Sequence, residues 1–139
     1  MMAEGSMTSV RPDIDIRADI YEIVVHYPPL AADRQYIDVQ VEGGRVILSG
    51  NVSNPINRRY LVDRAATVPG VTAVDAERLA DDISINIAAG RLLPPGMVAH
   101  SHHGTVVLSG SLPEGIDLDA VANRVAALPG VRRVIVSLR

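Results

Sequence analysis

Two histidines that stand two positions apart, His100 and His102, are the first candidates for chemistry. Side chains at positions i and i+2 of a strand point to the same face, so this pair could bind one divalent metal ion. The sequence offers no third ligand beside them, whereas a catalytic zinc usually has three protein ligands and a structural zinc four. A polar hairpin tip is the favoured interpretation, and we predict no metal site and no cofactor.

Two pairs of adjacent arginines are the candidate ligand-binding residues, Arg58 with Arg59 and Arg132 with Arg133. A guanidinium group suits bidentate contacts with phosphate, so the pairs could bind lipid headgroups or another anion if they converge in space. The alternative is an ordinary solvated surface. The net charge of −3 and the 16 acidic residues favour that alternative.

No arrangement of residues predicts catalysis. The chain has no cysteine, which excludes disulfides, thiolate metal sites and cysteine nucleophiles. The repeated dipeptides Ser49–Gly50 and Ser109–Gly110 lack the G-x-S-x-G pattern of a nucleophile elbow. Gly43–Gly44 joins two expected strands rather than opening a helix, so it is not a phosphate-binding loop. We predict a protein without catalytic residues.

The elements that carry these residues occur twice, because the sequence resembles itself at an offset of sixty positions. The offset holds without a gap from the first hairpin to the last strand. It aligns Gly44 with Gly104, Leu48–Ser49–Gly50 with Leu108–Ser109–Gly110, Arg64 with Arg124, Pro69–Gly70–Val71 with Pro129–Gly130–Val131, and Val74 with Val134.

Each copy reads as a hairpin, a helix and a further strand. Residues 37–42 alternate apolar and polar side chains, and Gly43–Gly44 supplies a tight turn into a second strand. Asn54 before Pro55 predicts a helix start, and Pro69–Gly70 predicts its end. The core face of this helix is expected to hold Ile56, Tyr60, Leu61, Ala65 and Val68 in the first copy, and Ile116, Ala120, Val121, Val125 and Leu128 in the second.

A further helix is expected before each hairpin. Between Pro12 and Tyr27 the apolar residues have helical spacing. Residues 81–93 are ambiguous, since Ile83, Ile85 and Ile87 alternate like a strand, but the repeat favours a short helix. We therefore predict an α+β protein with two tandem α-β-β-α-β modules, each a mixed three-stranded sheet with two helices on one face. The expected divisions are residues 1–10 as a disordered N-terminus or cloning remnant, 11–80 as module 1 and 81–139 as module 2.

Composition limits the location and the partners. A pI near 5.7 argues against a dedicated nucleic-acid binder, which usually has a basic face. No apolar run approaches the roughly 18 residues of a transmembrane span, and the first residues do not form a signal peptide. We expect a cytoplasmic location for the chain as given, or a periplasmic or envelope-associated one if an export signal has been removed.

The repeated motif resembles the BON domain. The resemblance rests on residues 37–50, which read IDVQVEGGRVILSG, on Val68–Pro69–Gly70–Val71, and on the strand through Val74 to Leu79. The second copy is similar but has His102–His103–Gly104 where the first has Glu42–Gly43–Gly44. The resemblance implies a bacterial, non-enzymatic module that binds phospholipid surfaces and often occurs as a tandem pair.

Two functions remain open. The resemblance predicts peripheral association with anionic phospholipid or the cell envelope, with arginines clustered beside an exposed apolar patch. The alternative is a soluble protein-interaction or small-ligand module, which predicts an apolar surface or pocket without clustered arginines. The expected partner is thus an anionic phospholipid or another protein, and in either case the chain could form a homo-oligomer.

Overall fold

A computed structural model describes residues 10–139, and the elements follow one another in the order α-β-β-α-β, twice. The N-terminal half adds one short helix and one 3-10 turn between its first long helix and its first strand. The elements are α2 (Asp13–His26), α3 (Pro28–Ala31), η1 (Arg34–Tyr36), β1 (Ile37–Glu42), β2 (Arg45–Val52), α4 (Pro55–Ala66), β3 (Ala73–Asp81), α5 (Asp82–Gly90), β4 (Met97–His102), β5 (Thr105–Gly110), α6 (Leu118–Ala126) and β6 (Arg133–Leu138).

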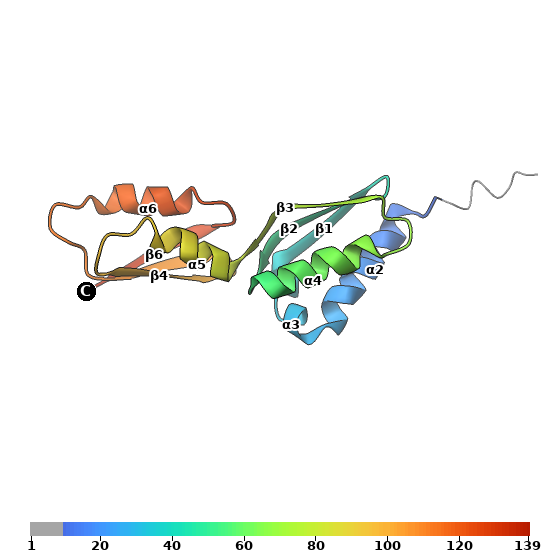
Figure 1. Ribbon diagram of the computed structural model, residues 1–139, viewed down its shortest axis with the longest axis horizontal. Helices are drawn as coiled ribbons and strands as arrows, with labels where there is room; N and C mark the ends of the chain where they lie inside the picture. The colour runs from blue at the N-terminus through green and yellow to red at the C-terminus, as the bar shows by residue number, and fades with distance from the viewer. Residues whose placement is uncertain (1–9) are drawn as a thin grey trace, which may run out of the picture.

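The described strands form two separate three-stranded sheets, ordered β1-β2-β3 and β4-β5-β6. In each sheet the first two strands pair antiparallel and the third pairs parallel to the second, across the helix that joins them. The halves lie end to end, and the helices of each half cover one face of its sheet (Figure 1). The predicted fold class is confirmed, and the ambiguous stretch after Ala80 is the helix α5.

Side-chain caps define where three helices begin. Asn54 accepts a hydrogen bond from the backbone N–H of Asn57 at 2.8 Å, as its position before Pro55 predicts. Asp81 caps α5 through the N–H of Ser84, and Asp117 caps α6. Each carboxylate or amide oxygen satisfies donors that the first helical turn leaves free.

The predicted core face of the second helix is wrong at its first position in both copies. Ile56 is 76% exposed, and Ile116 lies before α6 and is 40% exposed. The buried positions of α4 are Asn57, Leu61 and Ala65, at spacings of four, and Ile56 projects to the side of that stripe. Asn57 can occupy the core because its amide donates to the carbonyl of Pro29. Ala120 of α6 is also exposed.

Each half has its own hydrophobic core, and the two cores differ in size. The N-terminal cluster includes Ile16, Ile20 and Val24 from α2, which confirms that this helix serves the core. The C-terminal cluster is smaller and centres on Ile85, Val106 and Leu108. A small core stabilises weakly by itself, so contacts with the N-terminal half matter more to the C-terminal half.

The predicted N-terminal division falls mostly on residues 1–9, which lie outside the described residues. The predicted boundary at residues 80 and 81 stays a prediction, although one element ends at Asp81 and the next begins at Asp82.

Candidate functional site

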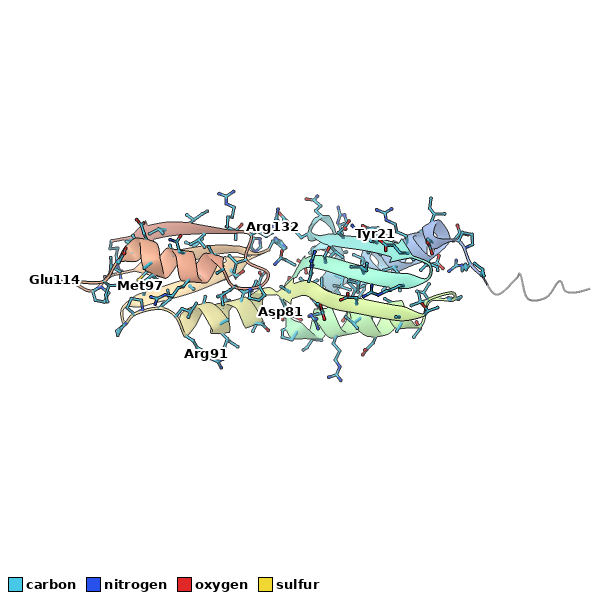
Figure 2. The ribbon with its side chains drawn as sticks, turned by 90° about the horizontal axis from the view of Figure 1, so that it is seen from above. Tyr21, Asp81, Arg91, Met97, Glu114 and Arg132 are labelled. Atoms are coloured by element: carbon cyan, nitrogen blue, oxygen red, sulfur yellow. The ribbon has the colours of Figure 1, made fainter. Side chains whose placement is uncertain are left out.

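The two halves meet without a linker. The last residue of β3, Asp81, is also the N-cap of α5, so the edge strand of one sheet runs directly into the first helix of the other half. Figure 2 shows Asp81 and Arg132 at this junction, between the two halves. A connection with no free residues restricts the relative motion of the halves, and surfaces that both halves form can therefore keep their shape.

A hydrogen-bonded contact between a histidine and a carboxylate holds the junction on the side of the β4–β5 turn. His103, in that turn, directs Nε2 to Oδ1 of Asp33 at 2.7 Å. Asp33 is 1% exposed and also accepts hydrogen bonds from the N–H and hydroxyl of Ser53. The Nδ1 atom of His103 is buried and has no hydrogen-bond partner among residues 10–139. The carboxylate therefore sets the orientation of the imidazole.

Stacking and a backbone contact complete the junction. The ring of Tyr36 stacks on His103 with centroids 3.8 Å apart, and the guanidinium of Arg132 lies 5.6 Å from the Tyr36 ring. Asn51 donates from its side-chain amide to the carbonyl of Gly130 at 2.9 Å. The junction therefore joins β2 and the segment before β1 to two separate loops of the C-terminal half.

Asp33 lies in a stretch that is longer in the first half than in the second. The first helices of the two halves align at an offset of 69, since Arg11 and Ile16 lie against Gly70 as Ala80 and Ile85 lie against Gly130. From the hairpins onward the offset is 60, so the first half contains nine additional residues between its first helix and first strand. Tyr36 has a counterpart in Gly96, since the carbonyl oxygens of these two residues lie against Gly50 and Gly110, respectively. The additional residues therefore lie before Tyr36, in the stretch that contains Asp33.

A second carboxylate fixes the turn that carries His103. Asp82, at the start of α5, accepts hydrogen bonds from the backbone N–H groups of His103 and Gly104 and from the hydroxyl of Ser101. Asp13, at the start of α2, accepts from Gly43 and Gly44 in the same way. In both halves, therefore, an aspartate at the first position of the first helix accepts hydrogen bonds from the backbone of the hairpin turn.

A groove of about 790 Å³ runs along the junction between α4 and α5. One wall is a single face of α4 and the other a single face of α5, because the residues from each helix follow helical spacing. Val62, Leu79, Ala80, Ile85, Ala88 and Leu128 form its apolar surface, and Pro55, Arg58, Arg59, Asp63, Glu77, Asp81, Ser84 and Pro129 complete the lining. The volume falls in the range of ligand-sized pockets.

The four candidate arginines do not gather in one place. Arg58 lines the groove but donates to the carbonyl oxygens of Leu79 at 2.6 Å and Ala76 at 2.7 Å. Arg59 is exposed at the groove rim and lies 3.9 Å from Asp63. The remaining pair lies elsewhere.

Arg132 contacts Tyr36 at the junction and lines a different hollow of about 340 Å³. Arg133 opens β6 and is exposed. Arg58 and Arg132 therefore have partners within the chain, and a role in ligand binding for the four arginines stays a prediction.

The candidate metal ligands lie on the exposed face of β4. His100 and His102 are both exposed, and His102 lies 4.2 Å from the ring of His103. No group of three histidine, cysteine or acidic side chains that could hold a metal occurs within residues 10–139. The sequence analysis did not select His103, the histidine that has a buried partner. One signal pointed to it, because His103 stands at the turn position where the N-terminal half has Gly43.

Comparisons with known proteins place the fold. The family model of the BON domain matches residues 12–85, from the start of α2 into α5. No curated protein matches the chain significantly. None of the described helices is long and apolar enough to cross a bilayer.

Two solved structures share the fold. One is described as CdsD, a structural protein of the type III secretion system of Chlamydia trachomatis, with a TM-score of 0.72 and 16% identity. The other is the C-terminal domain of CdsD, with a TM-score of 0.63 and 20% identity. Each alignment covers 93% of this chain, which spans only 63% and 66% of those two chains.

Proposed function

The chain belongs to the BON-domain family, and from this premise we propose that it is a non-catalytic protein-interaction unit built from two BON modules. The second module is the C-terminal half, beyond the residues that the family model matches. Its element order, its hairpin at an offset of sixty and its turn held by Asp82 support this assignment.

The groove between α4 and α5 carries the proposal. Its walls are two helical faces, and its floor includes Leu79 and Ile85, so a third helix could pack along it as in helix-in-groove recognition. Glu77 and Asp63 add carboxylates to the rim beside Arg59. The partner we propose is an amphipathic helix with an apolar stripe and basic residues beside it.

The structural neighbours support a role in an assembly. Both are described as structural proteins of a secretion system. At sequence identities of 16% and 20%, the similarity shows only that the fold is shared. We therefore propose that the chain is a non-catalytic part of a protein assembly associated with the cell envelope. Its location stays a prediction.

Peptide display tests the groove. We expect peptides selected from a random display library to carry apolar residues at helical spacing and to lose binding to Ala88→Glu, because that side chain places a charge in the groove. Ile87→Glu is the matched control, since Ile87 is 53% exposed on α5 and does not line the groove. Selected peptides without helical patterning, or equal loss with both variants, would overturn the proposal.

A second candidate function rests on the uncovered face of the C-terminal sheet. In the described strands this face carries Arg133, His100, His102, Val98, Val107, Ile135, Thr105, Ser109 and Ser137, and no carboxylate. The corresponding face of the N-terminal sheet carries Asp38, Glu42 and Asp75. A face with cations, apolar side chains and no acid suits anionic phospholipid.

Vesicle flotation tests the second candidate. The chain is expected to float with phosphatidylglycerol vesicles at low salt and not with phosphatidylcholine vesicles, because the attraction is electrostatic and screened. Arg133→Glu should reduce flotation, whereas Arg59→Glu, at the groove rim, should leave it unchanged. If wild-type protein stays unbound at every salt concentration, the phospholipid function is excluded.

A further inference from the structure

The two sheets differ in how well the free edge of their third strand is protected from pairing with another strand. In the N-terminal sheet the edge strand β3 is protected by Arg58, which donates to the carbonyl oxygens of Ala76 and Leu79. Its pairing with β2 is interrupted by a bulge, and it carries the charged residues Asp75, Glu77 and Arg78. Capped carbonyls, bulges and charges are the usual means by which proteins prevent a sheet edge from pairing with another strand.

The equivalent strand β6 has none of these protections. Its register with β5 is regular from Arg133 to Leu138, and no charged residue stands between these two. Position 58 of the first half corresponds to Leu118, whose side chain cannot donate a hydrogen bond. Within residues 10–139 no side chain forms a hydrogen bond with the β6 backbone.

The backbone groups that face outward can be identified. The backbone N–H of Arg133 donates to the carbonyl of Gly104, just before β5, and that of Arg139 donates to the carbonyl of Gly110, the last residue of β5. Backbone groups alternate sides along a strand, so the even-numbered residues direct both N–H and C=O away from β5. Val134, Val136 and Leu138 therefore present a free edge, and the side chain of Val136 is 40% exposed beside it.

We propose that this edge pairs with β6 of a second copy of the chain, antiparallel and about a twofold axis, to form a continuous six-stranded sheet. A second copy fits because the strand opposes no like charges between Val134 and Leu138, whereas β3 would oppose several. A twofold axis also makes the contact isologous, so one copy satisfies the edge of the other and no open edge remains at the interface.

The geometry favours an axis at Val136. This register pairs Val136 with its own copy and Val134 with Leu138, which uses all three outward-facing residues and gives about six interchain hydrogen bonds. The half-exposed Val136 side chains then bury each other on the helix-covered side. Arg133 faces Arg139 at the exposed ends of the paired strands, where like charges are most screened.

Sedimentation velocity of the full chain tests the proposal. Wild-type protein is expected to shift with concentration from the 14.8 kDa monomer to a dimer. Val136→Lys should raise the dissociation constant at least about tenfold, because two ammonium groups would meet at the axis. Ile135→Lys is the matched control, since Ile135 is 38% exposed, adjacent in sequence and on the opposite face of the sheet; it should dimerise as wild type does.

Amide exchange gives a readout that does not depend on a variant that folds. The N–H groups of Val134, Val136 and Leu138 should exchange slowly at high protein concentration and rapidly at low concentration, while those of Ile135 and Ser137 stay protected throughout. A monomer at all concentrations, or a dimer that Val136→Lys leaves intact, overturns the proposal. Neither outcome bears on the groove between α4 and α5, which lies at the junction.

Discussion

Replacing Asp33 with alanine is expected to lower the free energy of unfolding by about 3 kcal/mol, because buried hydrogen-bond donors would lose their partner. Asp33 is 1% exposed, and its carboxylate receives His103 Nε2 and both donors of Ser53. Alanine would leave these donors without a partner inside the junction. Urea denaturation followed by circular dichroism measures the loss.

The matched control is Asp75→Ala. Asp75 forms a salt bridge with Arg45 at 3.0 Å, but both side chains are partly exposed, so the expected loss is below about 1 kcal/mol. If the two alanine variants lose equal stability, the junction contact contributes no more than a surface ion pair. The groove could then not depend on it for a fixed shape.

The same substitution should also separate the motions of the two halves. The direct connection at Asp81 remains, but the contact on the opposite side of the junction, through Tyr36 and His103, loses its anchor. The groove walls come from both halves, so a looser junction should weaken any helix bound between α4 and α5. Stability and binding are thus expected to fall together in this variant.

The sequence was sufficient to predict the fold because each element carries a local signal. Asn54 and Pro55 indicate a helix start, and the cap bond to Asn57 confirms it. Comparison of the copies resolved the stretch after Ala80, where Ile83, Ile85 and Ile87 alternate like a strand yet lie in α5. The exposed side chain of Ile56 was predicted wrongly, because helical periodicity alone does not show which side of an apolar residue faces the sheet.

The junction could not be predicted in the same way. Its contacts join residues that are 70 positions apart in the case of Asp33 and His103, and 79 apart for Asn51 and Gly130. Local periodicity carries no information about such pairs. One signal was present, since His103 adopts a φ of 51° at a position where the first copy has Gly43. A histidine in this left-handed conformation costs energy that contacts elsewhere must offset.

The arginine pairs show the same limit. Adjacent arginines suggest an anion site, but residues next to each other in sequence point in different directions on a helix. Arg58 donates hydrogen bonds to the β3 carbonyls, whereas Arg59 is exposed at the groove rim beside Asp63. The structure was needed to distinguish these two roles. Part of the difference between the free edge of β6 and the protected edge of β3 depends on the Arg58 side chain, and its direction was equally hidden in the sequence.

Replacing Asp82 with alanine is the second substitution expected to have a large effect, about 3 kcal/mol in the free energy of unfolding. Its carboxylate is 7% exposed and accepts three hydrogen bonds, two of them from the backbone of the turn at His103 and Gly104. This turn positions the imidazole of His103, which contacts Asp33. Loss of the Asp82 carboxylate should therefore also disturb the junction.

The N-terminal half provides the control for this prediction. Asp13 makes the same two turn contacts with Gly43 and Gly44, but in a more exposed site and with no partner half beyond the turn, so Asp13→Ala should cost only about 1 kcal/mol. Urea denaturation compares the two variants, and amide exchange at Gly104 reports the turn directly. Equal losses would mean that the carboxylate only caps a hairpin. A larger loss for Asp82 would mean that the carboxylate of the C-terminal half also fixes the position of one half against the other.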